Sequence, residues 1–403
     1  MAEEPAAELT RAVRSGDVSA ARRLLEQYPE LRAGLDLPMH DGHFGATLLI
    51  AAVHTGNRAM VELLLGAGAD INQRSHWWAG SFGVLDDENE LVPWLIDRGA
   101  RVDAYAAARH GMMDRLGQIL EADPGAARMR GGDGQTPLHV ARTVEIAAYL
   151  LEHGAEIDAL DVDHESTPAQ YLVRDRPEVA RFLVSRGCRT DLLLAAALGD
   201  LALARRHLDQ DPGTIRLSVS LEDFPKRDSR AGGTIYIWTL GWNKTPHLVA
   251  REFGHPVMFQ FLMERSPETL QLAMALELGD DAAAQRLMAS RPDLVRSLGE
   301  AERRRLPAAA VDNDLPAVRR LLAAGWPLDA RANEGATALH WAAFHGNAEM
   351  VAEILRYGPD RTLRDLTYDG TALNWARYGA EHGWHPEDGD YPATIEALRS
   401  TGE

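Results

Sequence analysis

The chain has 403 residues, of which 45% are hydrophobic and 25% are charged, a composition typical of a soluble, well-packed protein. Its formal net charge of -18 argues against unspecific binding to nucleic acid or anionic lipid, because both need lysine and arginine to neutralise phosphates. The single cysteine, Cys188, excludes an intrachain disulfide and suits a reducing compartment. With no secretory signal and no apolar stretch near the roughly 20 residues that span a bilayer, we expect a cytoplasmic protein without a membrane or nucleic-acid partner.

One kind of repeat recurs along the chain as two apolar segments separated by a glycine and closed by a proline turn. Its four copies are Leu9 to Arg32, Tyr105 to Arg128, Leu193 to Arg216 and Leu272 to Arg296. An arginine follows each proline turn, and these four residues are candidates for clamping carboxylate or phosphate groups: Arg32, Arg128, Arg216 and Arg296. The favoured alternative is that they hold neighbouring repeats together through carboxylates.

A second kind of repeat opens on a threonine, usually followed by proline. Its copies begin at Thr136-Pro137-Leu138-His139, Thr167-Pro168-Ala169-Gln170, Thr245-Pro246-His247-Leu248 and Thr337-Ala338-Leu339-His340. Threonine before proline is a helix N-cap with proline at the first helical position. The glycines that close successive repeats, Gly154 and Gly187 or Gly325 and Gly358, are 33 residues apart.

These phrases at this period resemble the ankyrin repeat family, and the chain is identified as a bacterial-type ankyrin repeat protein. The resemblance implies an all-α solenoid of about 11–12 helix-turn-helix repeats with short hairpin-like turns, forming one array over residues 1–403. It also implies a binding surface made of the turn tips and the first helices. At the family's histidine position, His139 and His340 are expected to be structural and to bond the backbone of a neighbouring turn.

The longest interruption of the pattern is residues 217–244, which we call the finger. Its Thr234 to Thr239 stretch of β-branched and aromatic residues predicts a strand. The finger holds both lysines of the chain, Lys226 and Lys244, which would act as point-charge anion binders or as amines that lose a proton when buried. The favoured alternative is that an exposed insertion simply tolerates them.

Three further segments depart from the repeat pattern. Adjacent Trp77 and Trp78 indicate either an aromatic platform on the groove or packing against a neighbouring repeat. The acidic turn Asp161 to Glu165, which contains His164, resembles a set of metal ligands, but its spacing fits no recognised pattern and favours a solvated turn. His247 stands where a core leucine is expected and is interpreted as a hydrogen-bonded, partly buried histidine rather than as a base acting with Lys244.

No phosphate loop, HExxH, GxSxG or CxxC motif is present, so no catalytic residue, cofactor or metal site is predicted. The leading hypothesis is a scaffold that binds a protein or peptide on its concave face, and not an enzyme. The alternative is an enzyme or a binder of a sugar or anionic metabolite, with a pocket where the finger meets the groove. The candidate residues of that pocket are Lys226, Arg230, Tyr236, Trp238, Trp242, Asn243, Lys244 and His247, with His76, Trp77, Trp78, Asp163 and His164 opposite.

Overall fold

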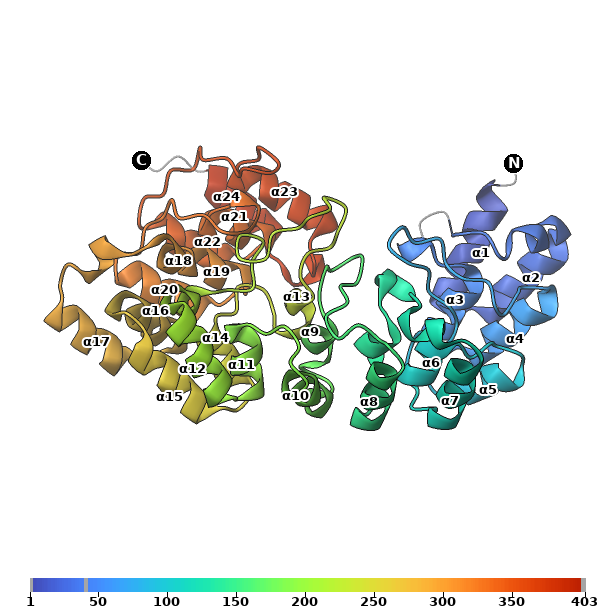
Figure 1. Ribbon diagram of the computed structural model, residues 1–403. Helices are drawn as coiled ribbons and strands as arrows, with labels where there is room; N and C mark the ends of the chain where they lie inside the picture. Colours follow the sequence, from blue (N-terminus) through green and yellow to red (C-terminus); the bar gives the residue numbers. More distant parts are fainter. Residues whose placement is uncertain (1–2, 40–42, 400–403) are drawn as a thin grey trace. The chain divides into compact units, whose positions relative to one another are not determined.

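The computed structural model describes residues 3–39 and 43–399, and within these ranges it contains helices and turns but no β-strand (Figure 1). Two isolated bridges, Ala332 with Ala336 and Arg364 with Thr371, are the only β-type pairings of the described residues. Each bridge lies in a turn that precedes a helix. The all-α repeat fold expected from the sequence is confirmed.

The chain divides into two compact units, unit 1 with residues 1–190 and 225–239, and unit 2 with residues 191–224 and 240–403. The single array over 1–403 with an inserted finger stays a prediction. Unit 1 contains α1 (Glu3–Ser15), α2 (Val18–Gln27), η1 (Pro29–Gly34), η2 (His43–Gly45), α3 (Leu48–His54), α4 (Arg58–Ala67), α5 (Val92–Asp97), α6 (Ala104–Arg109), α7 (Met113–Ala122), η3 (Pro124–Arg128), η4 (Gly132–Gly134), η5 (Pro137–Val140), α8 (Val144–Glu152), α9 (Pro168–Leu172), α10 (Pro177–Ser185) and α13 (Tyr236–Thr239).

Unit 2 repeats the same design. It contains α11 (Leu192–Leu198), α12 (Leu201–Gln210), η6 (Pro212–Arg216), α14 (Pro246–Glu252), α15 (Pro256–Arg265), α16 (Glu268–Leu278), α17 (Asp281–Ser290), η7 (Leu294–Ser297), α18 (Glu300–Arg303), α19 (Arg305–Val311), α20 (Leu315–Ala323), η8 (Asn333–Gly335), α21 (Ala338–Phe344), α22 (Ala348–Leu355), α23 (Ala372–His382), η9 (Pro386–Asp388) and α24 (Tyr391–Arg399).

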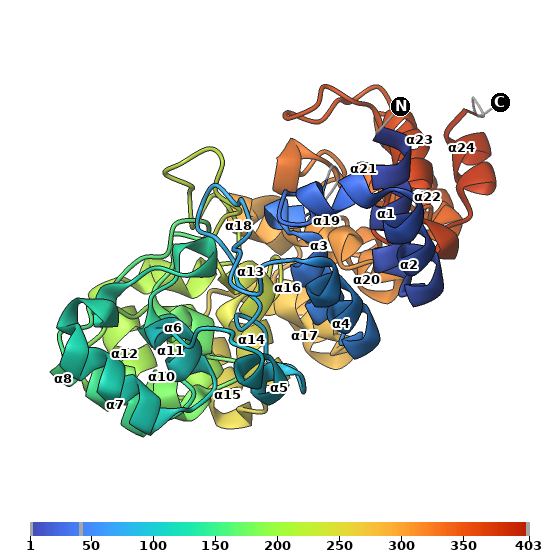
Figure 2. The same ribbon diagram turned by 90° about the vertical axis from the view of Figure 1, so that its right-hand side faces the viewer.

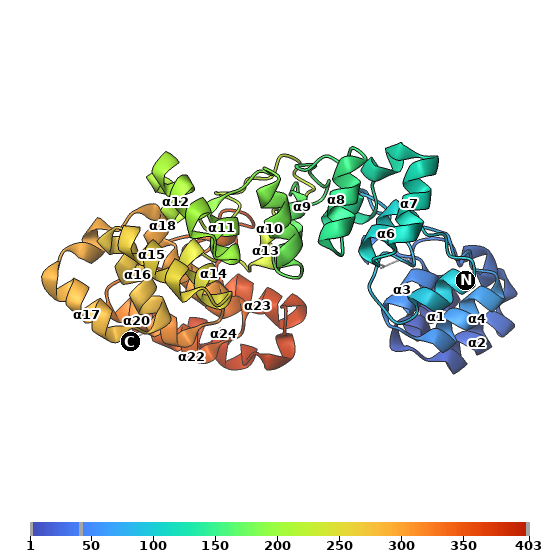
Figure 3. The ribbon, with the colours of Figure 1, turned by 60° about the horizontal axis from the view of Figure 1, so that its bottom comes forward.

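Each repeat packs a first helix against a second one, as α3 and α4 or α6 and α7 do in unit 1 (Figure 2) and α11 and α12 do in unit 2 (Figure 3). The central first helices are largely buried, and every residue of α11 is in the core. They carry many alanines because a first helix lies between its own second helix and the first helices of the adjacent repeats, where large side chains do not fit. The second helices have one buried stripe, which in α22 consists of Met350, Val351 and Ile354.

Glycine and a short polar residue set the corner between the two helices. In the repeat that holds α21 and α22, Gly346 has a φ of 62°, a left-handed conformation that favours glycine. Asn347 then accepts a hydrogen bond from the Met350 N–H to its Oδ1 at 2.9 Å and so caps α22. These two residues therefore separate α21 from α22.

The strand predicted at 234–239 is wrong, because this stretch forms the short helix α13. The N–H of Ile237 donates to the Thr234 carbonyl at 3.1 Å, and the N–H of Thr239 donates to the Ile235 carbonyl at 3.0 Å. α13 packs against α9 rather than against a strand edge. Since the described part of unit 1 offers no sheet edge, the β-branched residues satisfy their backbone groups within one helical turn.

Candidate functional site: a first-helix pocket and an Asp–Asp–His cluster

The first helices α6, η5 and α9 of unit 1 pack side by side and line a pocket of about 570 Å³, which we call the first-helix pocket. Pockets of this size are typical of sites that hold a small ligand or one anchoring side chain of a partner. Its lining is mostly polar or charged and consists of Glu88, Arg109, Gln135, His139, Val140, Tyr171, Leu172, Asp175 and Arg176.

Arg109 is the cation at the base of this pocket. Its Nη2 donates to the Tyr105 hydroxyl at 2.9 Å, and that hydroxyl donates to Gln135 Oε1 at 2.8 Å. Burial raises the pKa of Tyr105 to about 12, so the hydroxyl stays neutral and keeps this bonding order. The Nε of Arg109 is buried and has no hydrogen-bond partner among the described residues. This nitrogen is therefore enclosed by the fold, while other parts of Arg109 line the pocket.

Two more arginines share the carboxylate of Glu88, and one of them, Arg176, also lines the pocket. Glu88 accepts from Arg142 Nη1 at 3.1 Å through Oε2, and from Arg176 Nη2 through Oε1. Glu88 belongs to the long loop between α4 and α5. A carboxylate thus already occupies this arginine pair, which shows the chemistry that the pair accepts.

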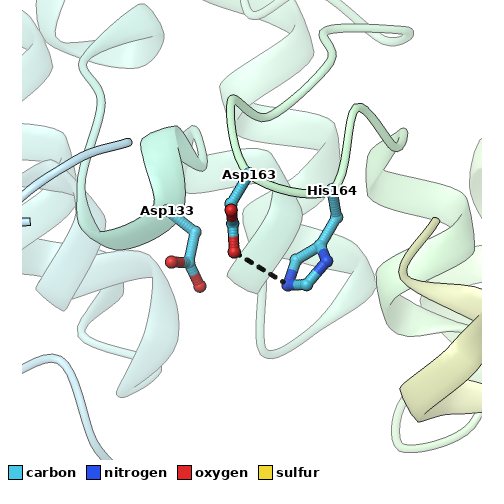
Figure 4. A group of neighbouring side chains, drawn as sticks. All are labelled: Asp133, Asp163 and His164. Carbon is cyan, nitrogen blue, oxygen red and sulfur yellow. Dashed lines mark ion pairs between the residues drawn. The ribbon is translucent and has the colours of Figure 1, made fainter. Parts of the chain in front are cut away.

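A second polar group lies at the tips of two successive turns of unit 1. The carboxylates of Asp133 and Asp163 and the imidazole of His164 converge, with one ligand atom of each within 4.8 Å of the others (Figure 4). We call these three residues the Asp–Asp–His cluster. Their side chains are well covered, since Asp163 is 8% and His164 11% exposed. The solvated turn expected at Asp161 to Glu165 is therefore wrong.

The finger is what covers this turn. The backbone N–H of Gly232 donates to the Asp163 carbonyl at 2.8 Å, and the carbonyl of Gly233 lies 2.8 Å from His164 Nδ1. Glu165 accepts from the N–H groups of Arg227 at 2.7 Å and Asp228 at 2.9 Å. Residues 225–239 are held on unit 1 by polar contacts to the turn that precedes α9, and these contacts replace its water.

Burial disfavours the charged form of two carboxylates in this region, those of Asp133 and Asp161. Burial raises the pKa of Asp133 to about 6, while the nearby His164 opposes the shift and the Asp163 carboxylate adds to it. Burial also raises the pKa of Asp161, whose oxygens accept from the N–H groups of His164 at 2.7 Å and Ser166 at 2.8 Å. Asp161 fixes the turn, whereas Asp133, Asp163 and His164 face one another.

The two tryptophans pack rather than form an open platform. Trp77 donates from Nε1 to Asp133 Oδ1 at 3.0 Å, and the guanidinium of Arg230 lies 4.3 Å from the ring centroid of Trp78. This cation–π contact occupies the ring face of Trp78. His76, which precedes the pair, is exposed.

The remaining candidates of the finger fall into different units. In unit 1, Lys226 donates to the Ser229 carbonyl at 3.2 Å, Tyr236 is fully buried and Trp238 is 72% exposed. In unit 2, Lys244 pairs with Asp312 at 3.3 Å, and Trp242 is half-buried. Both lysines therefore have a polar partner, and their role as anion binders stays a prediction.

His247 and Asn243 are core residues of unit 2. His247 is fully buried with its Nε2 2.7 Å from Ser266 Oγ, and burial lowers its pKa to about 4. This is the hydrogen-bonded histidine that the sequence favoured, although it is buried completely and not in part. Asn243 is 4% exposed.

Two of the four clamp candidates bind groups of their own unit. Arg128 donates from Nε to the Gly154 carbonyl at 2.6 Å, and Arg216 pairs with the buried Glu302 at 2.9 Å. Arg32 and Arg296 are exposed. Arg216 thus binds a carboxylate, as the favoured alternative predicted, whereas Arg128 binds a backbone carbonyl.

Sequence reasoning missed Asp133, Arg109 and the arginine pair at Glu88. A signal for Asp133 exists, since it lies in the turn tip one repeat before Asp163, and tips of successive repeats stack. Arg109 ends a first helix one repeat before Gln135. The charge pair at Glu88 involves an irregular loop and has no periodic signal.

Comparison with known families identifies the repeats in three stretches of the chain. Three stretches match family models described as ankyrin repeats: residues 44–76 match a single ankyrin repeat, 104–194 ankyrin repeats in three copies, and 306–352 ankyrin repeats in many copies. The histidines of the Thr-x-x-His phrases agree, because His139 Nε2 lies 3.1 Å from the Ser166 carbonyl and His340 Nε2 lies 3.1 Å from the Gly370 carbonyl, each in the following turn. The chain is an ankyrin-repeat protein, and such repeats are characteristic of scaffolds for protein–protein interaction.

Several curated proteins resemble parts of the chain. The B-cell lymphoma 3 protein of Homo sapiens is 29% identical over 170 residues, which cover 41% of this chain and 32% of that protein. The ankyrin repeat and SAM domain-containing protein 6 of Mus musculus is 28% identical over 143 residues, or 34% of this chain and 16% of that protein. The chain thus spans about a third or less of these relatives.

Among solved structures, the human ASB11 ankyrin repeat domain aligns with 75% of this chain and 100% of its own, at 16% identity and a TM-score of 0.26. Within residues 3–39 and 43–399, no helix combines the length and the apolar character needed to cross a bilayer.

Proposed function

We propose that this ankyrin-repeat protein is a recognition scaffold in the cytoplasm that binds a protein partner through the first-helix pocket of unit 1. The observation that supports this most is the polar pocket on α6, η5 and α9, which Arg109 and Arg176 line. An acidic side chain or a C-terminal carboxylate of the partner would suit these cationic side chains. It would also compete with Glu88 for Arg142 and Arg176.

The alternative of a small-molecule or enzymatic site at the finger has less support. Both lysines that motivated it have partners, Lys226 with Ser229 and Lys244 with Asp312. His247, the candidate base, is fully buried and its lowered pKa leaves it neutral near pH 7.

Site-specific photo-crosslinking in cells tests the scaffold. Asp175 on the pocket wall and Glu178 on α10 are both exposed and three positions apart, so each can carry a crosslinking side chain. We expect a discrete protein adduct from position 175 and not from position 178. Equal adducts from both positions would contradict the proposal that the partner binds at the first-helix pocket.

The purified partner then allows affinity to be measured. Removing two cations, in Arg142→Ala with Arg176→Ala, should weaken binding by about 30- to 1,000-fold, because each charge-assisted hydrogen bond contributes roughly 1–2 kcal/mol. Arg115→Ala on the exposed face of α7 is the matched control and should change nothing. Unchanged affinity in the double variant would refute the carboxylate clamp.

A further inference from the structure

We propose that the Asp–Asp–His cluster of Asp133, Asp163 and His164 is a binding site for one divalent transition-metal cation, which fastens residues 225–239 to unit 1. This inference is independent of the proposed partner. The cluster shares no residue with the lining of the first-helix pocket. It could therefore bind a cation whether or not a protein partner occupies that pocket.

The spacing of the ligand atoms favours a cation over direct bonds. Asp163 Oδ2 and His164 Nε2 are 3.6 Å apart, which is too long for a hydrogen bond. Two ligands of a tetrahedral zinc ion, each bound at roughly 2.1 Å, are separated by about 3.4 Å. Asp133 supplies a third ligand atom within 4.8 Å of the other two, and the three side chains face a common space in Figure 4.

Each ligand is oriented by a hydrogen bond from outside the cluster. Trp77 donates to Asp133 Oδ1 at 3.0 Å, and the Gly232 N–H lies 3.2 Å from Asp163 Oδ1. The Gly233 carbonyl, 2.8 Å from His164 Nδ1, is an acceptor and therefore places the ring proton on Nδ1. The Nε2 lone pair then points towards the carboxylates. Metal-binding histidines and carboxylates are held by such outer contacts in known metalloproteins.

Electrostatics point the same way. Two carboxylates and the lone pair of a neutral imidazole converge in a covered site, and this arrangement concentrates negative charge unless a cation lies among them. The mixed oxygen and nitrogen set suits Zn²⁺ or Mn²⁺, whereas Mg²⁺ and Ca²⁺ prefer oxygen ligands alone. Three protein ligands leave a position for water.

The contacts of the finger indicate what a cation in this cluster would do. Gly232 and Gly233 bind Asp163 and His164 directly, so ordering these two side chains around a cation also orders the backbone that contacts them. A Cβ at Gly232 would approach His164 Cε1 to 3.2 Å and Asp163 Oδ2 to 3.3 Å, which shows how closely the finger covers the cluster.

Zinc titration of the full chain, stripped with a chelator, tests the site at pH 7.5. We expect the wild type to bind one equivalent of zinc. His164→Ala and the isosteric Asp133→Asn should bind that zinc at least about 100-fold more weakly. The matched control is His385→Ala, because His385, Glu387 and Asp388 form a similar group whose members are all exposed. Far-UV circular dichroism without metal shows whether each variant is folded. If His164→Ala is not folded, Asp133→Asn provides the test.

Trypsin provides a second readout, since Lys226, Arg227 and Arg230 are exposed cleavage sites on the same segment. Free zinc at 100 times its dissociation constant should slow cleavage there by up to about 100-fold in the wild type, because the cation binds only the closed segment. Zinc that binds equally to the wild type and Asp133→Asn would overturn the proposal. So would loss of the zinc equivalent in His385→Ala alone, failure to bind zinc, or cleavage that zinc does not slow.

Discussion

Arg305 and Glu277 form a two-point ion pair in the core of unit 2. Nε and Nη2 of Arg305 lie 2.9 and 2.6 Å from the two carboxylate oxygens of Glu277, and the side chains are only 5% and 8% exposed. The remaining Nη1 donates to the Asn243 carbonyl at 2.7 Å. The pair therefore joins α16 and α19 to the end of the finger.

Breaking this pair from one side should be costly. In Arg305→Met, the Glu277 carboxylate stays buried without its cation, and we expect the free energy of unfolding to fall by about 3–5 kcal/mol. The double variant Arg305→Met with Glu277→Leu should recover most of that loss, because it removes both charges. Urea denaturation measures both values. A double variant no more stable than the single one would count against this account.

His247 should make unit 2 sensitive to acid. Burial, with a smaller effect of the nearby Arg305, lowers the pKa of His247 from 6.5 to about 4. Below pH 6.5 the unfolded chain takes up a proton that folded His247 accepts only near pH 4, so stability falls as the pH drops through this window. At pH 5 the loss is about 2 kcal/mol. His247→Gln should lose about that much less between pH 7.5 and pH 5 in urea titrations, whereas identical losses would show that His247 does not contribute.

Two helical glycines should respond oppositely to alanine. A Cβ at Gly379 in α23 would lie 2.3 Å from the carbonyl oxygen of Phe344 in α21, and backbone cannot move away cheaply. We expect Gly379→Ala to cost about 1–3 kcal/mol or more. At Gly66 in α4 no atom lies within 4 Å of the added Cβ, so Gly66→Ala should stabilise by up to about 1 kcal/mol. Thermal unfolding of both variants measures the two signs.

Arg216 and Arg296 occupy equivalent positions but should differ in importance. Glu302 is fully buried, and its Oε1 accepts from Arg216 Nε at 2.9 Å and from Thr269 Oγ1 at 3.1 Å. Arg216→Ala leaves this carboxylate short of a donor and should cost about 1–3 kcal/mol. Arg296 is exposed, so Arg296→Ala should stay within about 0.5 kcal/mol. Similar losses in urea denaturation would contradict the distinction.

The sequence predicted those features that repeat. The role of His139 follows from its place in a Thr-x-x-His phrase, and the structure confirms it, with His139 Nε2 3.1 Å from the Ser166 carbonyl of the following turn. The same role is predicted for His340, whose Nε2 lies 3.1 Å from the Gly370 carbonyl. Local chemistry decides these positions, and the same neighbours return in every repeat.

What the sequence left open depends on how irregular segments pack. The 234–239 stretch predicts a strand by its composition, but a short apolar run does not distinguish a strand from a buried helical turn. The Asp–Asp–His cluster joins Asp133 to residues of the following turn, and its covering comes from Gly232 and Gly233, far along the chain. No spacing rule links these positions, since the finger occurs only once.

The division of the chain also bears on how the protein is made. Residues 225–239 belong to unit 1, although the segments on either side of them belong to unit 2. During synthesis from the N-terminus, unit 1 cannot be completed when Thr190 leaves the ribosome, because α13 and the Gly232–Gly233 cover arrive only with Thr239. A nascent chain stalled before that point would expose the Asp–Asp–His cluster and the side of α9 that α13 covers to chaperones and proteases.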